Sequence, residues 1–164
     1  MILTAGTALG TEAGNSLRRR YQTLGELRLL LGMLKGELQY GAVPLDDIFE
    51  RLANRMEGNA GRFFRESALA MREPGSGSLE EVLNRYGKTC LGECGLSENE
   101  KKRLVQVCTS LGRLDREAQG NLLAGYLSAL ELEERTALEK VKQKETMYRC
   151  LGVLGGLFFA ILFY

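Results

Sequence analysis

The sequence predicts an all-α protein, an antiparallel bundle of about six helices that ends in a C-terminal transmembrane helix. The composition supports this class, because the 164 residues include two prolines and no tryptophan but many leucines, glutamates, arginines and lysines. Apolar residues also recur at helical spacing between recognisable capping and turn signals. Finally, the chain closes with "CLGVLGGLFFAILFY", a run without charge, amide or proline.

The first predicted helix covers residues 17–40 and is followed by a turn. Its leucines recur at steps of three and four, which places them on one helix face: Leu24, Leu27, Leu31, Leu34 and Leu38. Gly41 suits a left-handed C-terminal cap, and Pro44 suits the first turn of a second helix. Asp46 and Asp47 then lie in that first turn, where carboxylates meet the positive end of the helix dipole.

A short third helix is expected around residues 60–71, where it carries Phe63 and Phe64 into the core. The stretch "EPGSGS", residues 73–78, combines proline, glycine and serine and therefore predicts a loop.

Three capping signals open the remaining helices. "SLEE" pairs Ser78 with Glu81, and "SENE" pairs Ser97 with Glu100, each in the spacing of a capping box. Asp115 is placed to cap a long last helix, whose outer face carries the i,i+4 pairs Glu131–Arg135 and Glu145–Arg149. The predicted core draws on every helix: Leu31, Leu38, Ile48, Leu52, Phe63, Leu83, Leu104, Leu111 and Leu122.

The composition argues against an enzyme and against a nucleic-acid binder. The 22 basic and 21 acidic residues nearly balance, so no strong field attracts nucleic acid. Histidine is absent, which removes the Ser/His and Cys/His nucleophile pairs. The acid pairs Asp46–Asp47 and Glu133–Glu134 are adjacent in sequence, so on a helix their side chains point about 100° apart, as caps and solvated residues do. We therefore expect no catalytic site, no cofactor and no small-molecule substrate.

The four cysteines are Cys90, Cys94, Cys108 and Cys150. Cys90 and Cys94 are spaced like half of a metal site, but no second close pair or histidine completes it, so no metal site is expected. The pattern favours reduced thiols in a cytosolic domain, while sequence alone leaves a disulfide open.

The apolar runs at its two ends divide the chain into a candidate N-terminal membrane segment at 1–16, a cytosolic helical bundle at 17–148 and a C-terminal membrane helix at 149–164. The last run spans about 22 Å as a helix, short of the roughly 30 Å hydrocarbon core, and Met147 and Tyr148 extend it. It is apolar all round rather than on one face, which favours a membrane anchor over a buried core helix. Its small residues suit close helix contact in lipid: Gly152, Gly155 and Gly156.

The N-terminal segment is short for a membrane span, and Glu12 interrupts it, so one span and two spans both stay open. Basic residues follow it instead of preceding it, unlike a signal peptide. They flank both segments on the bundle side, which places the bundle in the cytosol by the positive-inside rule: Arg18, Arg19, Arg20, Lys140, Lys142, Lys144 and Arg149.

Three stretches carry a resemblance to a known family. "ELQYGAVPL" at 37–45, "LGRLDREAQGNLL" at 111–123 and the closing "LGVLGGLFFAIL", in this order and spacing, resemble the stage III sporulation protein AB family. The resemblance extends from about residue 5 to the C-terminus; the departure is the first membrane helix, which is truncated here and carries Glu12.

The resemblance implies a sporulation protein of the mother-cell membrane around the forespore, in the channel-like assembly that links the two cells. The family is similar in fold to the inner-membrane platform protein of type II secretion and type IV pilus systems. By that analogy the bundle docks a cytosolic ring ATPase, stage III sporulation protein AA, together with other channel subunits. The partner-binding residues expected near the two cytosolic turns are Gly41, Pro44, Gly112, Asp115 and Gln119.

Two alternatives stay open. The chain can be a soluble helical adaptor that oligomerises through its apolar C-terminal helix. The turn residues can also be purely structural: Gly41, Pro44 and Gly112 as turn formers, Asp115 as a helix cap, and Gln119 as a residue that hydrogen-bonds the neighbouring turn.

Overall fold

The protein is described here by a computed structural model. It describes the backbone of residues 2–40, 43–92 and 94–163, and within these the side chains of residues 15–39, 43–92, 94–147, 150–151 and 161. Six helices and no strand occur within this part of the chain, as the sequence predicts. They are α1 (Ile2–Tyr40), α2 (Leu45–Ala53), α3 (Asn59–Arg72), α4 (Leu79–Cys90), α5 (Glu98–Leu111) and α6 (Arg116–Phe163).

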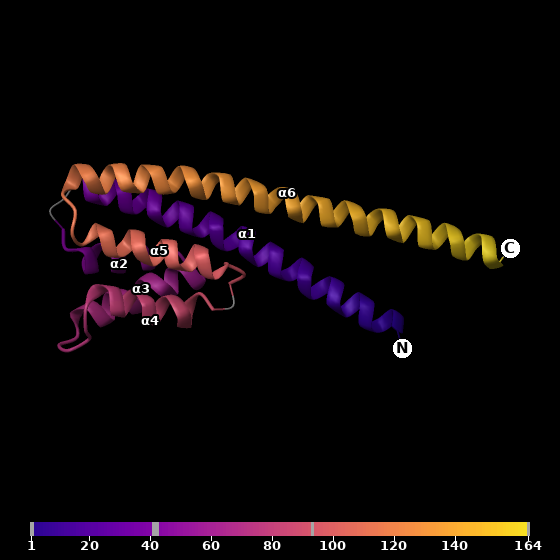
Figure 1. Cartoon of the computed structure of the whole chain (residues 1–164), viewed down its shortest axis with the longest axis horizontal. Helices are drawn as coiled ribbons and strands as arrows, with labels where there is room; N and C mark the ends of the chain where they lie inside the picture. Colours follow the sequence, from indigo (N-terminus) through magenta and orange to yellow (C-terminus); the bar gives the residue numbers. More distant parts are fainter. Residues whose placement is uncertain (1, 41–42, 93, 164) are drawn as a thin grey trace.

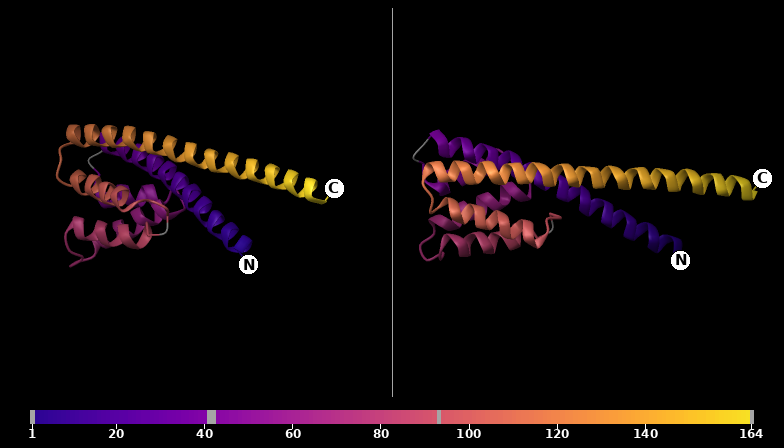
Figure 2. Two further views of the ribbon diagram at one scale, coloured as in Figure 1. Left: turned by 45° about the vertical axis from the view of Figure 1, so that its right-hand side comes forward. Right: turned by 45° about the horizontal axis from the view of Figure 1, so that its top comes forward.

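The two longest helices, α1 and α6, run antiparallel and form one layer of the molecule (Figure 1). The four short helices pack on one side of this pair and cover the part of α1 that is farther from the N-terminus. Figure 2 shows that both termini point away from the bundle in the same general direction, while α1 and α6 diverge as they leave it. Because α6 has 48 residues, it is about 72 Å long at 1.5 Å per residue, and much of it projects beyond the short helices.

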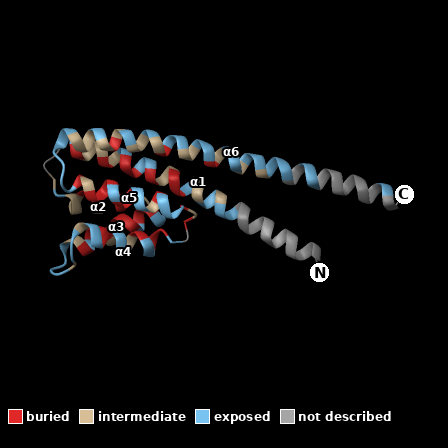
Figure 3. Cartoon of the chain, viewed as in Figure 1, coloured by how far each residue is buried: buried red, intermediate tan, exposed pale blue. Residues whose placement is uncertain are grey.

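The core lies where the short helices meet α1. The five leucines of the predicted α1 face are all buried, and Leu30 joins them. Two edge-to-face contacts link three buried aromatic rings, with centroids 4.8 Å apart for Phe49–Phe64 and 5.2 Å for Phe63–Phe64. Figure 3 shows the buried residues gathered on the inner faces of the bundle, whereas the described part of α6 beyond it is mostly exposed.

The prediction for one core residue, in α6, is wrong. Leu122 is only partly buried, and its neighbour Leu123 is fully buried instead. Among the described side chains of α6, the buried ones are Leu123, Leu130 and Ala137, one every seven residues, so a narrow stripe faces α1 and Leu122 lies on its flank. The other eight predicted core residues are buried.

The capping signals are confirmed. Both capping boxes have both of their hydrogen bonds, at Ser78–Glu81 and at Ser97–Glu100. The Arg135–Glu131 ion pair on α6 is also present, at 2.7 Å, while the predicted Glu145–Arg149 pair lies outside the described side chains. Helix α1 is longer than the predicted 17–40, because its backbone is helical from Ile2.

Candidate functional site

The two turns predicted to meet a partner lie at one end of the bundle, opposite the end at which the N-terminal part of α1 and the C-terminal part of α6 leave it (Figure 1). Between the last turns of α1 and the first turns of α6 is a cleft of about 420 Å³. It is lined by Lys35, Gln39, Arg116, Glu117, Gly120, Asn121 and Ala124. The sequence predicts the turns but not this cleft, because its lining comes from helix faces about 80 residues apart.

Each predicted partner-binding residue near the α5–α6 turn has a local structural contact. One carboxylate oxygen of Asp115 accepts a hydrogen bond from the Ala118 amide at 2.8 Å, which is the expected N-cap of α6. The Gln119 side-chain amide donates to the Leu111 carbonyl at 2.7 Å and so fastens α6 to the end of α5. Gly112 ends α5, and a Cβ atom there would lie 2.7 Å from a methyl group of Leu79.

At the α1–α2 turn, Pro44 is exposed and precedes the first residue of α2. Gly41 lies outside the described residues. Asp115 is the exposed acidic residue among the predicted set, and its second carboxylate oxygen has no hydrogen bond within the described chain. It is therefore the residue of this set best placed to contact another molecule while still capping α6.

At the same end of α2, the sequence identifies the acidic pair Asp46–Asp47 but not the ion pairs that these residues form. Arg72 of α3 forms ion pairs with three α2 carboxylates: Asp46 at 2.9 Å, Asp47 at 2.6 Å and Glu50 at 2.6 Å. These hydrogen bonds, above all the one to Asp46, raise the pKa of Arg72. One cation against three carboxylates leaves this corner of the bundle net negative.

At the opposite end of the bundle, the loop between α4 and α5 holds α1. The Thr23 hydroxyl donates to the buried Cys94 carbonyl at 3.2 Å. Gly95 has a φ of +81°, and a Cβ atom there would lie 2.7 Å from the Ser16 carbonyl oxygen and 2.9 Å from the Arg20 amide nitrogen. The loop therefore lies directly against the α1 backbone, at the level where α1 leaves the bundle.

An ion pair completes this contact. Arg20 Nη2 lies 2.6 Å from Glu100 Oε1, and the Glu100 side chain is 4% exposed. Burial disfavours the charged form of Glu100, but hydrogen bonds from Arg20 and from the Ser97 amide outweigh it and hold its pKa below the ordinary value. The sequence reveals Glu100 as a capping residue but gives no signal that Arg20, 80 positions away, is its partner.

The cysteines offer no reactive thiolate in the bundle. All four are free, and Cys90, Cys94 and Cys108 are buried. Burial raises the pKa of Cys108 to about 12, so this thiol stays protonated at neutral pH. Among the described residues, no group of three or more Cys, Asp or Glu side chains is arranged to hold a metal ion.

The predicted membrane segments fall largely outside the described side chains, which omit residues 1–14, 148–149, 152–160 and 162–164. Within the residues that are described, no helix carries an apolar stretch long enough to cross a bilayer.

Comparison with known proteins identifies the family. A family model described as "Stage III sporulation protein AB" matches residues 1–164. The chain belongs to the stage III sporulation protein AB family. The family's protein from Bacillus subtilis (strain 168) is 27% identical over 161 residues, which cover 98% of this chain and 94% of the relative.

A solved structure of a protein of the same name, SpoIIIAB, superimposes with a TM-score of 0.67 and 24% identity. It covers 76% of this chain and 97% of the solved one, and so supports the fold. The resemblance found in the sequence is therefore confirmed, and the chain is a sporulation protein of this family.

Proposed function

We propose that the protein is a non-enzymatic membrane platform subunit of the assembly that links the mother cell to the forespore during sporulation. Residues 149–164 anchor it in the mother-cell membrane, and its bundle lies in the cytosol. There it docks a ring ATPase of the stage III sporulation protein AA type and contacts other channel subunits. No cofactor, small-molecule substrate or nucleic acid takes part.

The observation that carries the proposal is the position of the two turns relative to the chain ends. Helix α6 begins beside the α5–α6 turn and runs its full length away from it (Figure 1). From Asp115 to Arg149 this helix covers about 50 Å. With residues 149–164 in a bilayer, the two turns form the face of the bundle farthest from the membrane, which a cytosolic ring ATPase meets first.

The charge distribution supports the same orientation. Arg18 and Arg19 on α1, and Lys140 and Lys142 on α6, are exposed on the stretches that leave the bundle. Basic residues beside a membrane segment favour the cytosolic side.

Membrane association is tested with the full chain in the producing cell. We expect the protein to sediment with membranes and to resist extraction by high salt and by carbonate. Deleting residues 150–164 should release it, because ten apolar N-terminal residues are too few to hold the chain alone. A full-length chain that stays in the supernatant would instead favour the soluble adaptor that oligomerises through its C-terminal helix.

Docking is tested by changing the charge of Asp115 in two ways. Asp115→Asn keeps an oxygen acceptor for the Ala118 amide and removes the charge, whereas Asp115→Lys removes the cap and reverses the charge. We expect both variants to weaken capture of the ATPase, and the lysine variant to lose in addition about 1 kcal/mol of stability. Glu139→Lys, at an exposed α6 residue on the membrane side of the bundle, is the matched control and should leave capture unchanged.

Thermal melting followed by helical circular dichroism separates docking from folding. If Asp115→Lys unfolds the bundle, or if Asp115→Asn captures the ATPase as well as the native chain does, Asp115 is a structural cap and the docking face lies elsewhere.

A further inference from the structure

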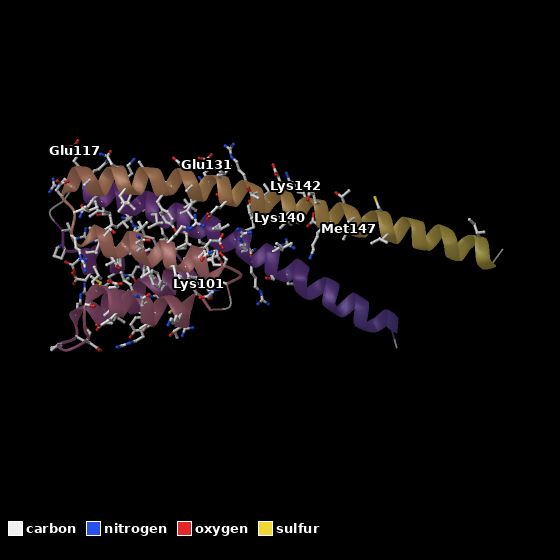
Figure 4. The ribbon with its side chains drawn as sticks, in the orientation of Figure 1. Lys101, Glu117, Glu131, Lys140, Lys142 and Met147 are labelled. Atoms are coloured by element: carbon white, nitrogen blue, oxygen red, sulfur yellow. The ribbon has the colours of Figure 1, made fainter. Side chains whose placement is uncertain are left out.

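A crevice opens between α1 and α6 where the two helices diverge, at the end of the bundle opposite the turns. It has a volume of about 330 Å³ and is lined by Leu17 from α1 and by Lys140, Gln143, Lys144 and Met147 from α6. Figure 4 shows Lys140, Lys142 and Met147 on the stretch of α6 from which α1 turns away. This crevice takes no part in docking at the distal turns.

The charges around the crevice are unbalanced. Two of its lining residues, Lys140 and Lys144, are cations, and neither forms an ion pair with an acid among the described side chains. No acid is among the described residues that line the crevice, so its walls carry two positive charges and no negative one.

Two arginines of the bundle, by contrast, are neutralised within the chain. Arg28 pairs with Glu134 and Arg103 with Glu133, both at 2.6 Å. Lys140 and Lys144 have no such partner among the described side chains, so the crevice attracts an anion from outside the chain.

The crevice also presents apolar surface. Met147 is 51% exposed and Leu151, one turn further along α6, is 59% exposed. Together with the partly buried Leu17, these side chains form an apolar strip that continues from the crevice toward the C-terminus. Long lysine side chains can extend past such a strip and place their ammonium groups at the level of lipid head groups.

We propose that this crevice binds an anionic phospholipid of the membrane in which the chain is anchored, which makes the inference dependent on the proposed function. The lysine ammonium groups of Lys140 and Lys144 contact the phosphate, and the acyl chain lies along Leu17 and Met147. Basic pockets between helices on the cytosolic side of a membrane are suited to anionic head groups. A lipid fits better than an acidic peptide because the crevice pairs cations with an apolar strip that runs on into the proposed membrane segment.

The test measures lipids that the full chain retains in a neutral detergent, by native mass spectrometry. The probes are phosphatidylglycerol and phosphatidylcholine with identical acyl chains. We expect the native chain to retain phosphatidylglycerol preferentially. The double variant K140Q/K144Q should reduce this preference by about 20- to 30-fold, since each lysine near an anionic membrane surface contributes roughly a factor of five.

The matched control is K102Q/R113Q, which removes the same charge from α5 and from the turn that follows it. Lys102 and Arg113 are both exposed and line a different groove, between α4 and α5. This variant should change the preference less than threefold. An equal loss in both variants would mean that net charge decides binding, and would overturn the crevice as the site.

Two further outcomes bear on the proposal. A native chain that retains both lipids equally overturns it, as does displacement of phosphatidylglycerol by a similar concentration of soluble glycerol phosphate, which would indicate a site for free phosphate. Failure of the membrane anchor is recognised separately, by carbonate extraction of the full chain from neutral phosphatidylcholine vesicles. A chain that is extracted there but still retains phosphatidylglycerol in detergent contradicts the anchor and supports the lipid site.

Discussion

The N-termini of α4 and α5 begin with the same local motif but differ in what the motif holds together. In both, a serine hydroxyl accepts from the backbone amide of a glutamate three residues later, at 3.3 Å. Glu81 of α4 is exposed, and its carboxylate accepts only the capping hydrogen bond from the Ser78 amide, at 3.3 Å. Glu100 of α5 caps with one oxygen at 2.6 Å and binds Arg20 of α1 with the other.

The difference shows how a local capping motif becomes a tertiary contact. Because Glu100 both caps α5 and binds Arg20 of α1, the start of α5 is fixed to α1 where α1 leaves the bundle. Glu81 fixes only its own helix, beside the loop at 73–78. Substitutions at the two sites should therefore separate the energy of capping from the energy of joining helices.

The largest difference in stability loss is expected between substitutions of the two capping glutamates. Glu100→Ala removes the cap and leaves Arg20 half-buried without its carboxylate, which should lower the free energy of unfolding by about 3 to 4 kcal/mol. Glu81→Ala loses only an exposed cap and should cost less than about 1 kcal/mol. Urea denaturation of the full chain in mild detergent, followed by helical circular dichroism, measures both. Equal losses would mean that the Arg20 contact adds nothing.

A smaller loss in the free energy of unfolding, about 2 to 3 kcal/mol at neutral pH, is expected for Arg20→Ala, because the Ser97 amide still stabilises the Glu100 carboxylate. This loss should depend on pH. The pKa of Glu100 lies below its ordinary value of 4.5 in the folded protein, so the ion pair contributes fully above that value and less as the pH falls through the folded-state pKa. Denaturation at pH 7 and at pH 3 should therefore show the gap between the native chain and Arg20→Ala narrowing in acid. A gap that is constant or wider at pH 3 would contradict the assigned pKa direction.

Gly95→Ala tests the loop that precedes α5, with Gly75→Ala as its control. Both glycines have positive φ, +81° and +85°, but a Cβ atom at Gly95 meets the α1 backbone, whereas at Gly75 nothing lies within 4 Å. We expect Gly75→Ala to cost about 1 kcal/mol for the backbone conformation alone, and Gly95→Ala about 2 kcal/mol or more. If the two denaturation midpoints shift equally, the loop does not press against α1 in solution.

Local signals explain why most of the fold could be predicted from the sequence. The leucine spacing in 17–40, the two capping boxes and the proline–glycine loop each depend on residues within one or two helical turns. The same locality explains the error at Leu122, because a seven-residue stripe leaves the choice between two adjacent leucines to the angle at which α6 meets α1.

The contacts that relate one helix to another could not be predicted. Arg20 is one of three consecutive arginines, and nothing local distinguishes it as the partner of a buried glutamate. The same holds for the Thr23–Cys94 hydrogen bond and for the crevice between α1 and α6. At the candidate docking end, the sequence indicated the turns and the cap at Asp115, while the Arg72 cluster and the cleft depend on tertiary packing.

The smallest expected effect compares the two capping serines. Ser78→Ala and Ser97→Ala each remove one acceptor for a helix N-terminal amide, at the same distance of 3.3 Å. Ser78→Ala should cost about 0.5 kcal/mol, because water can replace the hydroxyl at this exposed site, and Ser97→Ala about 1 kcal/mol, because its box is partly buried. In the Glu100→Ala background, the Ser97 substitution should cost no more than the Ser78 substitution does in the native chain, since the rest of the box is already lost. A Ser97 effect that is fully additive with Glu100→Ala would mean that the two residues act independently, and that the α5 box is two separate contacts.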